Sequence, residues 1–323
     1  MTNAMPVPRV VVSRCLEFDA CRYNGAMIPC RVVRLLTPFV EFVPVCPECE
    51  IGLGVPRKPI RVVRREGRLF LLQSETERDL SSAMRDFTGS FLDSLTDVDG
   101  FILKSRSPSC GPSEVRIYPG LGKVGAIDMG SGFFAGAVLE RFGHLPVETD
   151  GRLRNYRIRE HFLTRLFTLA RFRAVRQAGT MAALVQFHGE NKFLLQACNE
   201  AAMRTLGRLT ANHERRPVQE VLADYATHLG RVFAEPPAHT PFINVLEHCL
   251  GFFSKDLSGR EKQFFLGLVK RLREGRIPLS VPLNVLRAWA IRFEQDYLLQ
   301  QTVFQPYPEA LMDVSDSGKG RDL

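Results

Sequence analysis

The sequence has no long apolar run and lacks the features of a membrane or secreted protein. No window approaches 18 uncharged apolar residues in succession, so a membrane-spanning helix is not expected. The first residues, MTNAMPVPRVVVSR, interrupt their apolar stretch with two prolines and Arg9, unlike a signal peptide. We therefore expect a cytoplasmic protein with no membrane partner.

Patterns that mark other protein classes are also missing. The sequence shows no internal repeat and no heptad run, which argues against a solenoid or a coiled coil. The glycine-rich segment 120–136 lacks the phosphate-loop pattern and its strand-to-helix context, so we expect no nucleotide cofactor. We interpret this segment as a flexible loop that covers the substrate.

The length of 323 residues exceeds that of one ordinary domain and predicts two. The first part shows short apolar runs between helical segments, which predicts an α/β domain with an open, mostly parallel sheet. The second part shows apolar residues at helical spacing and few strand candidates, which predicts an all-α domain. We place the two domains at residues 1–148 and 149–323. The predicted helices of the second domain are 159–173, 192–209, 218–233, 241–253, 261–273 and 283–301.

Three predicted strands each lead into a segment that carries a cysteine. The predicted strands span residues 8–13, 39–45 and 100–104, and each is rich in β-branched or aromatic residues. The cysteines that follow are Cys15, Cys46 and Cys110. A helix is predicted over 76–95, ahead of the third strand. Because open α/β sheets place their sites beyond the carboxyl ends of the strands, we expect these cysteines to meet there.

Six of the eight cysteines lie in the first 110 residues: Cys15, Cys21, Cys30, Cys46, Cys49 and Cys110. In a reducing compartment such crowding indicates a metal site or redox chemistry rather than disulfides. A structural zinc site would favour two short-spaced pairs, and only Cys46 and Cys49 make one. Iron–sulfur clusters are held by thiolates, and three cysteine ligands would leave one iron open for substrate.

The segments around these cysteines resemble the TudS-type thiouracil desulfidase domain over residues 9–150. The motifs that carry the resemblance are Ser13 with Cys15, Arg22 to Gly25, Pro44 to Glu48, Gly52 to Arg57, Arg78 to Leu80, Gly100 to Lys104, and Ser107 to Gly111. The resemblance implies a [4Fe-4S] cluster held by Cys15, Cys46 and Cys110, with the substrate sulfur on the fourth iron. Cys49 departs from the usual apolar residue and is an alternative ligand to Cys46. We interpret Cys21 and Cys30 as structural.

The second half resembles the YbgA-type helical domain, through segments 192–195, 206–208, 261–263, 277–283 and 305–309. Together the two domains resemble the tRNA 4-thiouridine desulfidases, which implies thiolated tRNA as the partner. Independently, the whole net charge of +8 lies in residues 151–323, which hold 25 Lys and Arg against 17 Asp and Glu. Between residues 152 and 176 a single acidic residue, Glu160, accompanies eight arginines. We predict that these arginines bind RNA phosphates; alternatively, they only form a solvated helix face. They are Arg152, Arg154, Arg157, Arg159, Arg165, Arg171, Arg173 and Arg176.

The hypothesis is removal of sulfur from 4-thiouridine in tRNA to give uridine and sulfide, with no net redox step. The open iron would act as a Lewis acid on the thiocarbonyl group. Glu48 is the predicted general base, with Glu41 as second choice. Ser107 and Ser109 are predicted to position the attacking water, and Lys104 to stabilise developing charge. Alternatively, the two serines only shape the turn in which they lie.

Tyr23, Tyr118 and Phe133 are candidates for stacking on the substrate base, although such aromatic residues more often belong to a core. Other functions stay open: desulfuration of free thiouracil, an iron–sulfur or thiol sensor that binds nucleic acid, and a zinc-containing RNA-binding protein. Salt-dependent binding would separate tRNA from a free base as substrate. Release of sulfide would separate an enzyme from a sensor.

Overall fold

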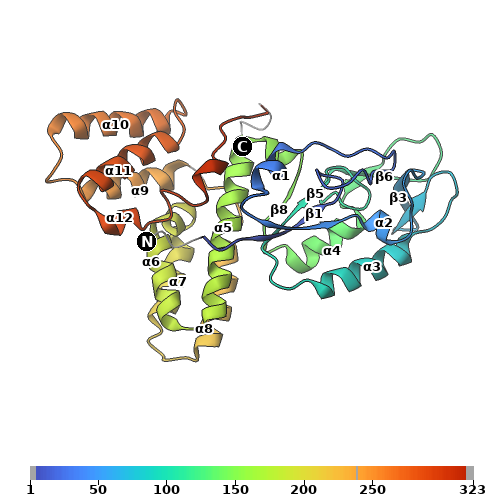
Figure 1. Cartoon of the computed structure of the whole chain (residues 1–323), viewed down its shortest axis with the longest axis horizontal. Helices are drawn as coiled ribbons and strands as arrows, with labels where there is room; N and C mark the ends of the chain where they lie inside the picture. The colour runs from blue at the N-terminus through green and yellow to red at the C-terminus, as the bar shows by residue number, and fades with distance from the viewer. Residues whose placement is uncertain (1–4, 238, 318–323) are drawn as a thin grey trace. The chain divides into compact units, whose positions relative to one another are not determined.

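The computed structural model describes residues 5–237 and 239–317, and Figure 1 shows the helices and strands that they form. The chain forms two compact units that divide within one long helix, α5 (Tyr156–Ala178). The first unit comprises the chain up to Ala170 together with the segment from Ala310, and the second comprises Arg171–Glu309. The domain boundary between residues 148 and 149 stays a prediction, since compactness alone does not define where a domain begins.

The first unit is built on a sheet of four parallel strands in the order β2-β1-β5-β8. The strands are β1 (Arg9–Ser13), β2 (Glu41–Val45), β5 (Gly100–Leu103) and β8 (Val147–Thr149). The central strand β1 buries Val10, Val11 and Val12 completely, as expected for a parallel strand covered on both faces. Ser13 pairs with Val45, so β1 and β2 end at the same edge. The predicted α/β architecture with cysteines after the strand ends is therefore confirmed.

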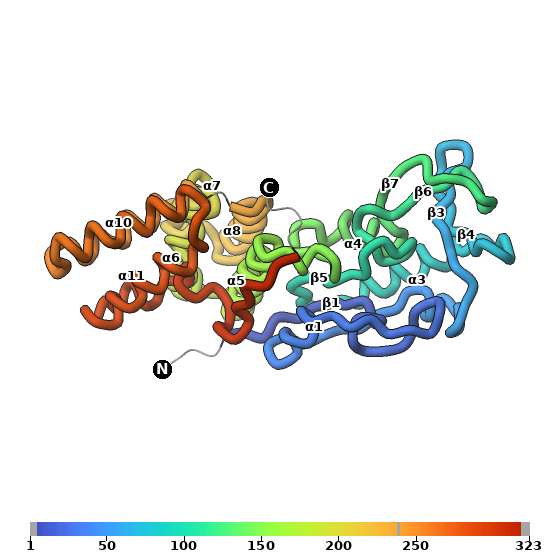
Figure 2. The backbone as a smooth tube through the Cα atoms, turned by 90° about the horizontal axis from the view of Figure 1, so that it is seen from above, coloured from blue at the N-terminus to red at the C-terminus, as the bar shows by residue number. Residues whose placement is uncertain are grey.

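A second, mixed sheet was not predicted from the sequence. Its order is β4-β3-β6-β7, and its strands are β3 (Ile60–Arg65), β4 (Arg68–Gln73), β6 (Val115–Tyr118) and β7 (Asp128–Gly130). β3 and β4 form a hairpin whose two loop residues, Glu66 and Gly67, both have positive φ, as a tight hairpin turn requires. Figure 2 shows these four strands gathered at one end of the first unit, away from β1 and β5.

Helices α3 (Ser81–Ser94) and α4 (Phe133–Phe142) cover the parallel sheet and share its core. Leu92 of α3 and Phe134 of α4 pack with Phe101 of β5 in one cluster. The first half of α5 approaches β5 so closely that a Cβ at Gly100 would lie 3.1 Å from the Leu166 side chain. Two short helices, α1 (Arg31–Leu36) and α2 (Pro47–Glu50), follow Cys30 and Cys46.

The second unit is helical, which confirms the predicted all-α region. Its helices after α5 are α6 (Met181–Cys198), α7 (Glu200–Ala211), α8 (Val218–Val232), α9 (His239–Gly251), α10 (Gly259–Arg273), α11 (Ser280–Arg292) and α12 (Asp296–Leu299). A short 3-10 helix of the first unit spans Arg152–Arg154, and another, Glu309–Leu311, lies where the chain passes from the second unit back to the first. Among the described residues, no helix is both long and apolar enough to cross a membrane.

Two predicted helices of this unit were wrong in their continuity. The helix predicted over 192–209 is interrupted at Asn199, whose backbone is extended and whose side chain accepts a hydrogen bond from the Ala202 N–H at 3.0 Å. Asn199 therefore begins α7 as a capping residue. The helix predicted over 283–301 ends at Arg292, because Glu294 adopts a φ of 51°.

Candidate active site

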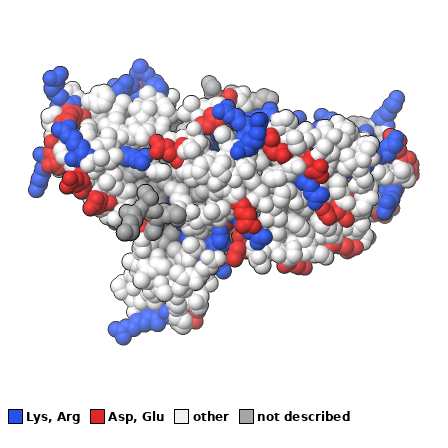
Figure 3. Space-filling model, viewed as in Figure 1, with Lys and Arg blue, Asp and Glu red and all other residues white. Residues whose placement is uncertain are grey.

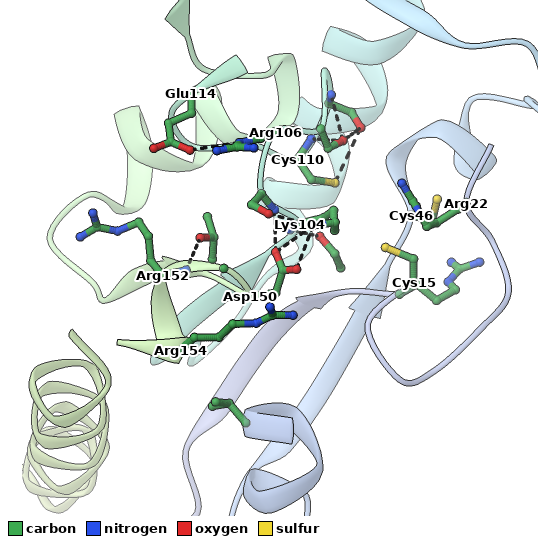
Figure 4. Close-up of a pocket in the computed structure, with 18 of the residues that line it drawn as sticks. Cys15, Arg22, Cys46, Lys104, Arg106, Cys110, Glu114, Asp150, Arg152 and Arg154 are labelled. Carbon is green, nitrogen blue, oxygen red and sulfur yellow. Dashed lines mark hydrogen bonds and ion pairs between the residues drawn. The ribbon is translucent and has the colours of Figure 1, made fainter. Parts of the chain in front are cut away.

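A cavity of about 1380 Å³ lies beyond the carboxyl ends of β1, β2 and β5. Its lining includes Cys15, Cys46 and Cys110, each from the segment that follows one of these strands. Figure 4 shows their sulfur atoms facing the same space. The fold thus brings together three cysteines that are far apart in the sequence.

Backbone contacts fix the loop that carries Cys110. The Ser107 hydroxyl oxygen accepts hydrogen bonds from the N–H groups of Ser109 (3.3 Å) and Cys110 (3.1 Å). The first turn of α4 adds the Ala135 N–H, which donates to the Ser109 carbonyl oxygen at 3.1 Å. Gly132 permits this approach, because a Cβ there would lie 2.5 Å from that carbonyl oxygen. Ser107 therefore does shape the turn.

Burial and repulsion by neighbouring thiols oppose ionisation of two of the three thiols, those of Cys15 and Cys110. Burial raises the pKa of Cys15 to about 12, and the neighbouring Cys46 adds to the rise. Burial also raises the pKa of Cys110 to about 12, against a smaller opposing effect of a hydrogen bond with Ser13. None of the three is in a disulfide. Positive charge from bound iron would stabilise the thiolates, as metals do for coordinating thiols.

Three of the thiols that line the cavity, those of Cys15, Cys46 and Cys110, have the chemistry that ligates an iron–sulfur cluster. Within residues 5–237 and 239–317, no three His, Cys, Asp or Glu side chains come together as ligands of one ion would. In a cluster each cysteine binds a different iron, so the sulfur atoms have to surround a volume instead of meeting at a point. Cys15, Cys46 and Cys110 all line the one cavity.

The alternative ligand Cys49 is not among the described residues that line the cavity, whereas Cys46 is. The sulfur atom of Cys49 lies 3.8 Å from the Arg57 guanidinium and 3.9 Å from the Cys21 carbonyl oxygen. Cys21 itself lines the cavity beside Cys46. Cys30 is buried at the start of α1. This placement favours Cys46 over Cys49 as the third ligand.

Glu48, the predicted base, lies in the cavity as part of a buried network. Its Oε1 accepts a hydrogen bond from the Ser109 hydroxyl at 2.7 Å, and its Oε2 lies 2.7 Å from Arg57 Nε. The side chains of Arg57 and Glu48 are only 6% and 12% exposed. The Ser107 and Ser109 hydroxyl oxygens are 3.0 Å apart, so the chain of polar groups extends toward Ser107. Arg57 belongs to a motif noted in the sequence, but the sequence assigned it no role.

Lys104 is held at the cavity wall by a carboxylate that the sequence did not indicate. Lys104 Nζ lies 2.8 Å from one oxygen of Asp150 and 3.1 Å from the other, and also contacts the Ser105 hydroxyl. Asp150 directly follows β8, as Cys46 follows β2. Strand-end reasoning could have identified Asp150, but no strand was predicted over β8.

Glu41 does not reach the cavity. It begins β2, at the opposite end of that strand from Cys46, where its exposed carboxylate pairs with Arg9 at 3.2 Å. Glu41 is also absent from the described lining of the cavity. The second choice of base is therefore not supported, because the strand's own direction carries Glu41 away from the thiols.

The eight predicted RNA-binding arginines are placed differently from one another. Arg159 is 3% exposed and donates to the carbonyl oxygens of Leu153 and Ser315, so it holds the fold together. Arg165 and Arg171 are half-buried and likewise donate to backbone carbonyls. The exposed members are Arg152, Arg154 and Arg176, and the half-buried ones include Arg157 and Arg173. On the face displayed in Figure 3, basic and acidic side chains are interspersed.

The aromatic candidates also separate by position. Tyr23 is 43% exposed and lines the cavity beside Arg22. Tyr118 lines a neighbouring, smaller cavity. Phe133 packs against the core of the second sheet and under Arg85, which makes it a packing residue.

Residues 10–150 match the family described as 2-thiouracil desulfurase, and residues 192–308 match a protein family of unknown function, DUF1722. The uncharacterized protein YbbK of Bacillus subtilis (strain 168) is 30% identical over 111 residues, which cover 32% of this chain and 72% of YbbK. A solved structure, the [4Fe-4S]-dependent thiouracil desulfidase TudS, is 27% identical to this chain, with a TM-score of 0.35. The matched region covers 45% of this chain and 93% of TudS. Through its first unit, which carries the cavity lined by Cys15, Cys46 and Cys110, the chain belongs to the 2-thiouracil desulfurase family, and it continues into a DUF1722 (YbgA-like) domain.

Proposed function

We propose that this protein removes sulfur from 4-thiouridine in tRNA, giving uridine and sulfide, with a [4Fe-4S] cluster on Cys15, Cys46 and Cys110. One observation carries the proposal. The three cysteines line a single cavity, and the hydrogen-bonded pair of Glu48 and Ser109 lines the same cavity. Membership of a desulfurase family supports the same chemistry.

A [4Fe-4S] cluster on these cysteines supplies, when bound, an open iron that polarises the thiocarbonyl sulfur of the substrate. The residues of the chain manage the water and its protons. Water that attacks C4 has to lose a proton, and the Ser109 hydroxyl is placed to accept it while passing its own proton to Glu48. The Arg57 guanidinium holds the Glu48 carboxylate in position for this transfer.

Lys104 supplies the positive charge of the site. Its ammonium group, oriented by Asp150, stabilises negative charge that develops on the pyrimidine during attack. C4 gains a bond to oxygen and loses its bond to sulfur, which takes up both protons of the water, one of them returned by Glu48, and leaves as hydrogen sulfide. The reaction is a hydrolysis, so it requires neither an oxidant nor a reductant.

The size and charge of the cavity support a nucleic acid as substrate. Its volume of about 1380 Å³ is larger than the roughly 300–1,000 Å³ usual for small-molecule sites. Nine Lys and Arg residues line it against five Asp and Glu residues. Arg152 and Arg154 are exposed members of that lining, and arginines at such a rim are suited to RNA phosphates.

The test is anaerobic reconstitution followed by incubation with tRNA that contains 4-thiouridine. Thione absorbance and released sulfide are followed together for the wild type and for Cys15→Ala, Cys46→Ala and Cys110→Ala. We expect each variant to lose at least about 100-fold in rate, since removal of one ligand disturbs the cluster. Cys198→Ala, in α6 of the second unit, is the matched control and should retain the wild-type rate. An intact thione in the presence of a properly formed cluster would refute the proposal.

Desulfuration of free thiouracil is the second candidate, because the matched family is described by that base. The two substrates differ in their response to salt. Turnover of tRNA at limiting concentration should fall steeply with salt, while turnover of an uncharged base should hardly change. Comparable rates with both substrates, equally insensitive to salt, would favour the free base.

A further inference from the structure

A second cavity, of about 530 Å³, adjoins the thiol cavity in the first unit. The two cavities share five lining residues: Pro59, Ile60, Arg106, Pro108 and Glu114. Pro108 and Arg106 belong to the same loop as Cys110. A polymer that places one of its units at the thiols can therefore place the next unit in the second cavity.

The wall of this second cavity contains a cation–aromatic pair. The guanidinium of Arg61, in β3, lies 4.7 Å from the ring centroid of Tyr118, in β6. Arg61 is held there by hydrogen bonds to the carbonyl oxygens of Leu121 and Gly122, at 3.3 and 3.1 Å. Both a guanidinium plane and an aromatic ring stack on nucleobases. The pair thus offers a preformed surface for a base.

The charges of the second cavity suit a phosphate. Three arginines line it, Arg61, Arg106 and Arg116, against one acidic residue, Glu114. Glu114 pairs with Arg106 at 3.3 Å, but both side chains are more than half exposed, so a phosphate can replace this carboxylate at little cost. Figure 4 shows the pair beside the Cys110 loop. Arg116 is exposed and forms no ion pair with any residue that the structure describes.

We propose that the second cavity binds the nucleotide adjacent to the thiolated one, with its base on the Arg61–Tyr118 pair and its phosphate at Arg106 and Arg116. This inference rests on the proposed function, since it takes the thiol cavity as the place of the modified base. It deepens that function by assigning the substrate class, because a free thiobase has neither a phosphodiester nor a second base. The protein therefore selects polynucleotides through its first unit, independently of the helical unit.

Binding is measured by fluorescence anisotropy on the full chain with a fluorescein-labelled oligouridylate that contains no sulfur. Arg116→Ala should weaken binding about tenfold and lower the slope of log Kd against log salt by about 0.7, the value for one phosphate contact on a single strand. Tyr118→Ala should weaken binding about tenfold through lost stacking, with the salt slope unchanged. Arg64→Ala, on the same strand as Arg61 but paired with Asp128 outside the cavity, is the matched control and should bind as the wild type.

A second measurement separates this inference from the proposed function. The ratio of kcat/KM for a 4-thiouridine oligoribonucleotide to that for the 4-thiouridine nucleoside should fall about tenfold in Arg116→Ala and stay at the wild-type value in Arg64→Ala. If no thiolated substrate is turned over but the binding pattern holds, the proposed function fails and the nucleotide subsite stands. Wild-type binding and salt slope in Arg116→Ala, or equal losses in Arg64→Ala, would overturn the subsite.

Discussion

The ion pair between Arg57 and Glu48 should be the most costly single contact of the active site to break. Both side chains are nearly buried, at 6% and 12% exposure, and the Nε–Oε2 distance is 2.7 Å. Removing one member of a buried pair leaves the other charge uncompensated, which costs about 3–5 kcal/mol. We expect that loss in unfolding free energy for Arg57→Met and, separately, for Glu48→Leu.

The double variant should be less destabilised than the sum of the two single variants. Once both charges are gone, neither is left buried and unpaired, so a coupling free energy of about 2–3 kcal/mol is expected. Arg57 also donates to the carbonyl oxygens of Cys21 and Gly54. These two hydrogen bonds are absent from Arg57→Met and from the double variant alike, so their loss cancels when the coupling is calculated. The coupling therefore isolates the ion pair from the rest of the arginine's contacts.

Urea unfolding followed by two probes makes this measurement specific to the first unit. The only tryptophan, Trp289, lies in α11 of the second unit, so its fluorescence serves as an internal control. Visible absorbance of the reconstituted cluster reports on the first unit. We expect the absorbance transition of the single variants to move to lower urea while the Trp289 transition stays in place. A coupling free energy below about 0.5 kcal/mol would refute the reasoning, because sites without a shared interaction add within that margin.

Three further predictions concern the cysteine loop, the helical unit and the C-terminal segment. Gly132→Ala should prevent normal cluster reconstitution, because the new Cβ would lie 2.5 Å from the Ser109 carbonyl oxygen. Gly136→Ala, whose Cβ would have its nearest contact at 3.8 Å, is the control and should reconstitute normally. Visible absorbance measures the reconstitution of both variants. Burial lowers the pKa of His188 below 6.5, so protonation of His188 favours the unfolded state. The unfolding free energy reported by tryptophan fluorescence should therefore fall as the pH drops through 6.5. The variant His188→Gln should lose that pH dependence. A pH-independent wild-type transition would contradict this assignment. Arg159→Leu should increase hydrogen exchange at residues 313–317, which Arg159 holds through two carbonyl oxygens, and unchanged exchange would contradict that role.

The sequence was sufficient to predict three of the four strands of the parallel sheet, because β1, β2 and β5 carry their own signal. The valines of β1 are buried on both sides, and such a strand appears as an unbroken run of β-branched residues. The chain leaves all parallel strands at the same edge, so a cysteine shortly after each strand has to approach the others. The geometry of Cys15, Cys46 and Cys110 was predictable for this reason.

The mixed sheet was not predictable in the same way. β3 and β6 pair in parallel although more than 50 residues separate them, and a pairing of that range has no local pattern. β3 and β4 also begin or end with exposed arginines that weaken the apolar alternation. The cavity that we assign to a neighbouring nucleotide is built on these strands, so only the folded chain reveals it.

Charge was the least reliable guide, since a count of arginines does not show what each guanidinium contacts. Arg159 was counted with a basic surface, yet its N–H groups are bonded to backbone carbonyls and it is nearly inaccessible. Arg57 received no predicted role from the sequence, yet it is the buried ion-pair partner of Glu48, the candidate base. Asp150 sits at a strand end that the sequence did not reveal and orients Lys104. Charged residues acquire their roles from partners brought by the fold, so the polar network around Glu48, unlike the position of the thiols, is evident only from the structure.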